Sequence, residues 1–261
     1  MTMNKSAAVA VVTGGASGIG AACCRELARR GYKVAVADID EAAAARVAAE
    51  VGGTAFAVDV ADEASAEDLA ARVERALGPV DALVNSAGVI QVPLPPETLP
   101  MSSWDHVIRV DQRGTYVACL AFGRRMAARG RGAIVNIASI AGMRSMPLHA
   151  YAPAKAAVIS ITECLAAEWG RSGVRINTVS PGYTRTPALQ AAIDRGQRDV
   201  TALEENSALG RMVEPEEIAK AVAFLAGSDA AAITGANLPV DAGWLVATSW
   251  HTYKGLPGKR D

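Results

Sequence analysis

A tyrosine and a lysine stand four residues apart in the stretch "YAPAK", from Tyr151 to Lys155. On a helix this spacing places both side chains on one face, where the lysine ammonium can stabilise a tyrosine phenolate. Pro153 favours the first turn of a helix, because a proline there loses no intrahelical hydrogen bond. A phenol ionises at a pH of about 10, so it needs such stabilisation to accept a proton near neutrality. The stretch predicts a proton-transferring tyrosine at the N-terminal end of a helix.

A second chemical motif is the glycine-rich stretch "TGGASGIG", residues 13–20, which follows a short apolar run. Glycines at 14, 18 and 20 allow the backbone to turn sharply and to approach a diphosphate. The helix that follows would offer free N–H groups and the positive end of its dipole. The order of the glycines differs from the general G-x-G-x-x-G signature. The stretch still predicts a diphosphate-binding turn, because a strand precedes it and a helix follows.

Asp38 favours one of the two nicotinamide dinucleotides. It ends the second predicted strand, where a carboxylate can accept hydrogen bonds from both adenosine ribose hydroxyls and would repel a 2′-phosphate. Ser17 and Ile39, beside the turn and the strand end, supply no compensating base. We therefore predict NAD as the cofactor, with NADP less favoured.

The elements that must position these residues alternate between short apolar runs and longer amphipathic ones. Continuous Val, Ile and Ala runs are typical of strands buried on both faces. The pattern predicts one α/β domain over residues 1–261, a Rossmann fold with a doubly wound, parallel, seven-stranded sheet and helices on both faces. The predicted strands are 7–12, 33–38, 54–59, 80–85, 132–139, 174–180 and 236–241. The predicted helices are 18–30, 41–51, 63–77, 103–129, 150–170 and 214–227.

Two longer segments interrupt this alternation, a Pro-rich loop at 91–103 and a connection at 183–212. Both leave the carboxyl ends of strands, where open α/β sheets bind ligands. We expect a lid at about 187–212 and a cap on the long helix from Ser102 or Ser103.

Composition excludes several classes of function. The net charge of the 261 residues is −1 and no basic tract predicts nucleic-acid binding. No apolar run approaches about 20 residues, and no secretory signal is visible, so we expect a soluble cytoplasmic protein without membrane contact. The four cysteines form no C-x-x-C pair, and we expect them to be buried thiols without a metal. The basic cluster of Arg124, Arg125, Arg129 and Arg131 is typical of a solvated helix end.

Further motifs follow the other predicted strands: "NSAG" at 85–88, Ser139, and "SPGYTRT" at 180–186. Together with the glycine-rich turn and "YAPAK", this ordered set resembles the short-chain dehydrogenase/reductase family up to about residue 243. The resemblance implies that Tyr151 is the general acid/base, that Lys155 lowers its pKa and holds the nicotinamide ribose, and that Ser139 binds the substrate oxygen.

The resemblance also implies a set of cofactor contacts, carried over from matching positions. They are Gly14, Ser17, Gly18, Ile19, Gly20, Asp38, Ile39, Asp59, Val60, Asn85, Ala87, Gly88, Pro181, Gly182, Thr184 and Thr186, together with Tyr151 and Lys155.

Two positions depart from the family pattern. Ser86 replaces an asparagine, which is a mild change between small polar residues. Asp111, in "VIRVDQRGTY", stands where the family has an asparagine whose backbone carbonyl holds a water linked to the lysine. Our hypothesis is that Asp111 still completes a catalytic proton relay with Ser139, Tyr151 and Lys155, with altered tuning; a purely structural role is the alternative.

The substrate side is less defined. Loops after the fourth, fifth and sixth strands supply the candidate contacts, which are Gln91, Arg144, Met146, His149 and Tyr183. Their hydrogen-bonding groups favour a small polyhydroxylated or secondary alcohol, such as a sugar alcohol, over a steroid.

The C-terminal tail, residues 244–261, is too aromatic for a solvated tail. We expect Trp244, Trp250, His251 and Tyr253 to pack across a subunit interface, and the resemblance implies a homotetramer or dimer. An aromatic patch within one chain is the alternative.

The leading prediction is an NAD-dependent oxidoreductase that interconverts a secondary alcohol and its ketone. A 3-oxoacyl carrier-protein reductase is the nearest alternative, and a non-catalytic NAD-binding sensor or scaffold is an alternative of another class.

Overall fold

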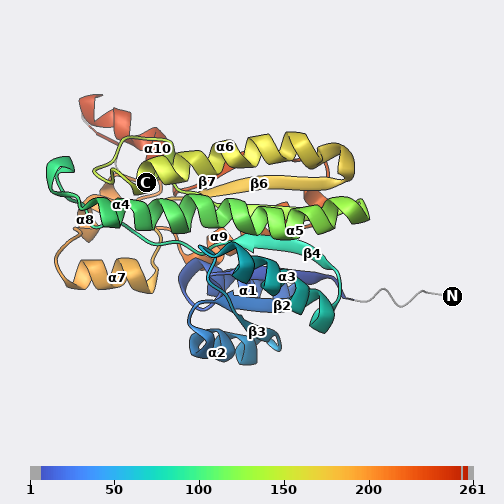
Figure 1. The fold of residues 1–261 in the computed structure, drawn as a ribbon. Coiled ribbons are helices and arrows are strands. Elements are labelled where there is room, and N and C mark those ends of the chain that lie inside the picture. The colour runs from blue at the N-terminus through green and yellow to red at the C-terminus, as the bar shows by residue number, and fades with distance from the viewer. Residues whose placement is uncertain (1–6, 254, 258–261) are drawn as a thin grey trace.

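Seven parallel strands form one sheet in the computed structural model, which describes residues 7–253 and 255–257. The strand order β3-β2-β1-β4-β5-β6-β7 means that the chain winds outward from β1 in one direction and then from β4 in the other (Figure 1). All pairings among these strands are parallel, which confirms the predicted sheet. The strands are β1 (Val9–Thr13), β2 (Lys33–Asp38), β3 (Thr54–Ala57), β4 (Val80–Asn85), β5 (Gly132–Ile137), β6 (Val174–Pro181) and β7 (Asn237–Val240).

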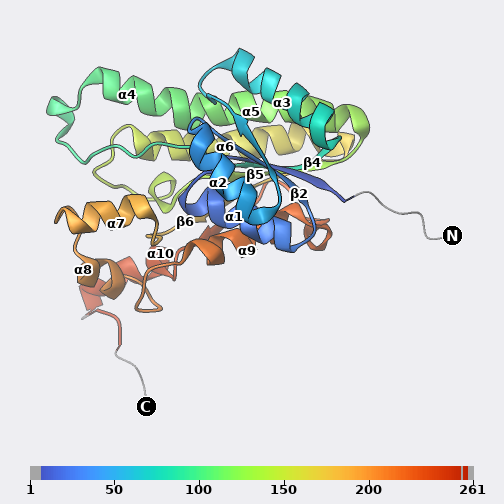
Figure 2. The same ribbon diagram turned by 90° about the horizontal axis from the view of Figure 1, so that it is seen from below.

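Helices cover both faces of the sheet (Figure 1, Figure 2). One core cluster joins α1, α2 and α9 to the sheet through residues such as Leu27, Val47 and Ile218. The other joins α3, α5 and α6 through Leu69 and Phe122, among others. The helices are α1 (Gly18–Arg29), α2 (Glu41–Val51), α3 (Glu63–Leu77), α4 (Met101–Val107), α5 (Thr115–Arg129), α6 (Tyr151–Trp169), α7 (Pro187–Asp194), α8 (Val200–Glu205), α9 (Pro215–Ala226) and α10 (Trp244–Ala247). Within the described residues, no helix has the length and apolar character that a membrane crossing requires.

The predicted helix 103–129 needs correction. It begins at Met101, and the backbone carbonyl of Pro100 accepts the first N–H groups, so neither Ser102 nor Ser103 is its cap. A π-helical segment, Ile108–Gly114, separates α4 from α5. Such wide turns redirect side chains and are frequent at functional sites. This one contains Asp111.

One smaller expectation is incomplete and another is wrong for one residue. The arginines of the basic cluster lie at the end of α5 as expected, but they also form ion pairs with Glu67 and Glu74 on α3 and with Asp81 on β4. Cys164 is exposed on α6, whereas the other three cysteines are buried as expected. Burial raises the pKa of Cys119 to about 12, so that thiol stays protonated at neutral pH.

A row of buried polar side chains fixes the position of α6 on the sheet. The Asn85 amide donates to Asn136 Oδ1 over 2.9 Å, and the Asn136 amide donates to Thr162 Oγ1 on α6 over 2.9 Å. Thr178 on β6 donates to the same threonine oxygen over 2.7 Å. Because buried polar groups are costly when unpaired, this row favours one seating of α6 over β4, β5 and β6.

Replacing Asn136 with alanine should lower the free energy of unfolding by about 2–4 kcal/mol, since Asn85 and Thr162 would each lose a buried partner. Urea unfolding followed by circular dichroism measures this loss. The exposed Gln190→Ala on α7 is the control, and its effect should stay within about 0.5 kcal/mol. A loss below about 1 kcal/mol for Asn136→Ala would contradict the structural role of the row.

Candidate functional site

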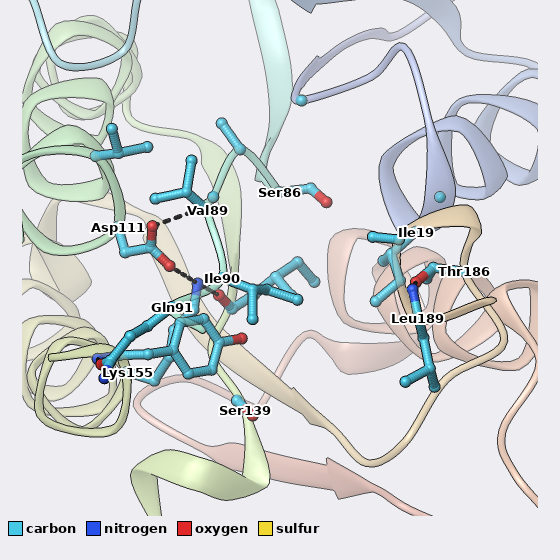
Figure 3. A pocket seen from close by; sticks show the side chains of 18 of the residues that line it. Ile19, Ser86, Val89, Ile90, Gln91, Asp111, Ser139, Lys155, Thr186 and Leu189 are labelled. Carbon is cyan, nitrogen blue, oxygen red and sulfur yellow. Dashed lines mark hydrogen bonds and ion pairs between the residues drawn. The ribbon is translucent and has the colours of Figure 1, made fainter. Parts of the chain in front are cut away.

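The carboxyl ends of the strands open into one elongated cavity of about 1100 Å³. Its walls come from the segments after β1 to β6 and from α7. In Figure 3, Asp111, Lys155 and Ser139 lie on one side of this cavity, and Ile19, Thr186 and Leu189 lie on the other. The site therefore lies where an open, doubly wound sheet is expected to bind its ligand.

The tyrosine–lysine pair lies where the sequence places it. α6 begins at Tyr151, so Pro153 falls in its first turn. Lys155 is buried, with 4% of its surface exposed. Its Nζ donates to the carbonyl of Ile137 at the end of β5 over 3.1 Å, and it lies 5.5 Å from the centre of the Tyr151 ring. The ammonium is thus fixed to the sheet beside the phenol.

Asp111 forms a direct ion pair with Lys155. Its Oδ2 lies 3.1 Å from Lys155 Nζ, and its Oδ1 accepts the Val89 N–H over 2.8 Å (Figure 3). The carboxylate is fully buried. Its backbone carbonyl accepts the Thr115 hydroxyl over 2.7 Å. The side chain therefore contacts the lysine itself, whereas the family pattern uses the backbone carbonyl of this position through a water.

The ion pair sets the charges around the phenol. Burial alone would lower the pKa of Lys155, but Asp111 and Tyr151 raise it above its usual range, so the lysine stays charged. Burial raises the pKa of Tyr151 above its ordinary value; Lys155 and a hydrogen bond with Ser139 oppose this rise, and Asp111 adds to it. The lysine therefore favours the phenolate, and the aspartate reduces that effect.

Ser139 follows β5 in extended conformation and begins the short turn Ile140–Gly142. Its Oγ accepts the Ala141 N–H over 3.1 Å, so its own proton is left to donate. Ser139, Tyr151 and Lys155 all line the cavity. The three residues that the resemblance names as catalytic are thus brought together.

The glycine-rich turn forms a cradle for an anionic group. The N-terminus of α1 has no side-chain cap, so its first N–H groups are free to bind an anion. A Cβ on Gly14 would lie 2.6 Å from the backbone of Ala87, and one on Gly20 would lie 2.0 Å from the Gly14 carbonyl oxygen. Only glycine fits at either position. These features fit the diphosphate of a dinucleotide.

Asp38, the last residue of β2, lines the same cavity as the glycine-rich turn. Its Oδ2 accepts the Ala16 N–H over 3.0 Å and its Oδ1 accepts the Asp40 N–H over 3.1 Å. These bonds fix the carboxylate at the cavity wall. Ile39 next to it is 76% exposed and brings no positive charge.

The cavity includes all the predicted cofactor contacts except Asn85. Asn85 is buried, and its amide donates to Asn136 Oδ1 and Cys119 Sγ. Of the predicted substrate contacts, Met146, Tyr183 and Gln91 line the cavity, whereas Arg144 and His149 do not.

Several cavity residues were not predicted individually. Leu148 and, on or after α7, Leu189, Arg195, Gln197 and Arg198 also line the wall. The apolar period of α7 indicates an amphipathic helix, but it does not reveal which neighbour that face meets. The lining includes apolar side chains such as Ile90, Val92 and Leu148, and polar ones such as Arg195, Gln197 and Arg198.

The C-terminal tail contributes to the same region from within the chain. Trp244 packs edge-on against Tyr183, with ring centres 5.8 Å apart. Trp250 and Tyr253 are exposed at 49% and 81%, so their place in a subunit interface stays a prediction. The side chain of His251 and residues 254 and 258–261 lie outside the described part.

Several known proteins are similar to this chain. A family model described as enoyl-(acyl carrier protein) reductase matches residues 14–245. D-threitol dehydrogenase of Mycolicibacterium smegmatis is 42% identical, over 91% of this chain and 93% of that protein. Galactitol 2-dehydrogenase (L-tagatose-forming) of Cereibacter sphaeroides is 41% identical, over 92% and 95%.

Solved structures are similar as well. One named ribose-5-phosphate isomerase, from Brucella melitensis 16M, is 55% identical, with a TM-score of 0.95 over 97% of this chain and 98% of that one. ElxO with NADP bound is 28% identical, with a TM-score of 0.87 over 92% and 99%. The two curated relatives carry the names of alcohol dehydrogenases, and the family model covers most of this chain. The chain belongs to the short-chain dehydrogenase/reductase family and is an oxidoreductase that uses a nicotinamide cofactor and acts on alcohol groups.

Proposed function

We propose that this enzyme oxidises a secondary alcohol of a small polyol to a ketone with NAD, and catalyses the reverse reaction. The observation that carries the proposal is the arrangement of Ser139, Tyr151 and Lys155 on one wall of a cavity whose other end is a diphosphate cradle with Asp38 at its rim. The names of the threitol and galactitol dehydrogenases support a polyol as the substrate.

The chain's own residues would handle the proton. When bound, the nicotinamide takes up or supplies the hydride. In oxidation, Tyr151 takes the proton of the substrate hydroxyl at its phenol oxygen, and in reduction it returns that proton. Ser139 donates a hydrogen bond to the same substrate oxygen, on which negative charge develops.

Lys155 would both hold the cofactor and keep Tyr151 reactive. An ammonium has three N–H donors. The Ile137 carbonyl accepts one of them and the Asp111 carboxylate forms an ion pair with the ammonium, so at least one donor remains for the nicotinamide ribose. Asp111 keeps this lysine charged and in place, at the cost of a less acidic Tyr151. We assign Asp111 the role of tuning the proton transfer toward alkaline pH.

Two other activities deserve an assay. One similar structure carries the name of ribose-5-phosphate isomerase. An isomerisation needs no dinucleotide, so it would leave the dinucleotide cradle without a role. An assay of ribose 5-phosphate isomerisation without added cofactor tests this activity. The description of the family model, like the 3-oxoacyl carrier-protein reductase alternative from the sequence, suggests an acyl thioester as substrate. An assay of NADPH oxidation with a 3-oxoacyl thioester tests this activity. A non-catalytic sensor is disfavoured because all three reactive side chains are in place.

A panel of polyols with NAD or NADP, followed by the absorbance of the reduced nicotinamide, should show NAD reduction by at least one polyol. Tyr151→Phe removes the proton acceptor and should lower kcat by roughly 10²–10⁴-fold. NADH binding, followed by fluorescence, should survive this change. Activity of Tyr151→Phe within threefold of the wild type would exclude the proposed mechanism.

Asp38→Asn should shift cofactor preference toward NADP, because it removes the charge that repels a 2′-phosphate but keeps an oxygen for the Ala16 N–H. The ratio of kcat/KM for NAD to that for NADP should fall roughly tenfold or more, which is about 1.4 kcal/mol. Asp40→Asn, which alters a carboxylate outside the cavity, is the matched control. A wild-type enzyme that reduces only NADP would overturn this argument.

Asp111→Asn should move the pH profile of alcohol oxidation. The amide keeps an oxygen for the Val89 N–H but removes the negative charge that raises the pKa of Tyr151. Oxidation needs the phenolate, so the rising limb of kcat against pH should move to lower pH as long as Lys155 keeps its charge. The exposed Asp105→Asn on α4 should leave the profile in place. An unchanged limb, or one moved to higher pH, would contradict the tuning role.

A further inference from the structure

The first turn of the catalytic helix is capped by a side chain from another segment. The N-cap residue of α6, Ala150, is an alanine and makes no side-chain bond. Instead, Gln91, about 60 residues earlier in the chain, accepts two N–H groups at its Oε1. They are those of Ala150, over 2.7 Å, and of Tyr151 itself, over 3.3 Å. Backbone N–H groups at a helix start have no intrahelical partner, so this amide supplies what the local sequence lacks.

The burial of Gln91 makes this cap rigid. The residue is 5% exposed, and its Nε2 is buried without a hydrogen-bond partner in the described part of the chain. An unpaired buried donor costs about 1–3 kcal/mol, which an apolar side chain of the same size would not incur. The two bonds at Oε1 are what this position gains from an amide.

Residues next to Gln91 hold the other half of the reactive pair. The Val89 N–H binds Asp111, and a Cβ on Gly88 would lie 3.2 Å from Asp111 Oδ2 and 3.4 Å from Lys155 Nζ. Segment 88–91 therefore contacts the phenol-bearing helix start at one end and the lysine's counter-ion at the other. Ile90 and Val92, in and beside this segment, form part of the cavity wall.

We infer that Gln91 is a positioning residue. From the loop that follows β4, it caps α6 and so fixes Tyr151 relative to Lys155 and Ser139. This inference rests on the proposed function of Tyr151 as the proton-transferring group. It assigns the Oε1 atom of Gln91 to the helix, so that this oxygen is not a substrate ligand. A small displacement of Tyr151 is sufficient to affect the rate, since about 1 Å of misplacement can cost roughly 10²-fold.

Two substitutions separate the cap from the bulk of the side chain. Gln91→Met keeps the length but removes the acceptor, and should lower kcat of alcohol oxidation roughly 10–100-fold. The dissociation constant of NADH should change less than about twofold, because the dinucleotide cradle is untouched. Gln91→Glu keeps an acceptor at the helix N-terminus, where a carboxylate is favourable, and should restore most of kcat at its optimal pH. If the Gln91→Met protein does not fold, Gln91→Asn takes its place, because its side chain is one methylene shorter and its oxygen would not reach the helix.

Asp62→Ala is the matched control. Asp62 caps α3 by accepting the Ala64 and Ser65 N–H groups, and it does not line the cavity. Its loss removes a comparable helix cap, worth about 1 kcal/mol of stability, and should leave kcat unchanged.

Amide hydrogen exchange gives a readout that does not depend on activity. Gln91→Met should accelerate exchange in the first turn of α6, and Asp62→Ala should not. If no alcohol is oxidised by the wild type but this exchange difference is found, the proposed function fails and the cap stands. A Gln91→Met enzyme with wild-type kcat, or with unchanged exchange at Tyr151, would overturn the inference.

Discussion

The buried ion pair between Asp111 and Lys155 is the interaction on which the rest of the site depends. Neither charge reaches solvent to any useful extent, and a lone buried charge would be strongly destabilising. Each charge therefore requires the other, and the elements that carry them must meet. The π-helical segment before α5 supplies the aspartate, and the first turns of α6 supply the lysine. The carbonyl of Ile137 adds the end of β5 to the same point.

The Asp111–Lys155 ion pair is better explained by the side-chain arrangement that it fixes than by a contribution to the stability of the fold. A buried ion pair is often no more stabilising than two apolar side chains of similar volume. The two charges favour a single arrangement of these side chains. In it, Lys155 Nζ lies 5.5 Å from the centre of the Tyr151 ring, and the main chain of Gly88 and Val89 packs against the ion pair. The buried row from Asn85 through Asn136 to Thr162 acts in the same sense a few turns further along α6. Polar interactions inside the molecule thus fix the helix that carries the chemistry.

The sequence predicts the parts of this arrangement that local physics controls. β2, β4, α2 and α3 have the bounds that periodicity and capping residues indicate, and Pro153 falls in the first helical turn as expected. The break between α4 and α5 was not predicted, because every residue from 108 to 114 can continue an ordinary helix and the wide turn is tied to the tertiary contacts of Asp111. The cap from Gln91 was not predicted for the same reason: it joins two segments that only the folded sheet brings together. Arg144 and His149 precede α6, as the sequence indicates, but in the folded chain they do not line the cavity.

The distribution of polar groups in the cavity also bears on how the proposed polyol substrate would be recognised. The cavity lining includes the apolar side chains of Ile90, Val92 and Leu148, which offer a hydroxyl no hydrogen bond. Hydroxyls away from the reacting carbon would need polar groups such as Arg195 and Arg198, which follow α7. A buried hydroxyl without a partner is costly, so a polyol gains from the site only when this segment lies over it. Binding energy from hydroxyls far from the reacting carbon is then available to hold that carbon against the cofactor. We therefore expect selectivity among polyols to depend on the segment 187–212, while the Asp111–Lys155 pair would fix the proton-transferring Tyr151.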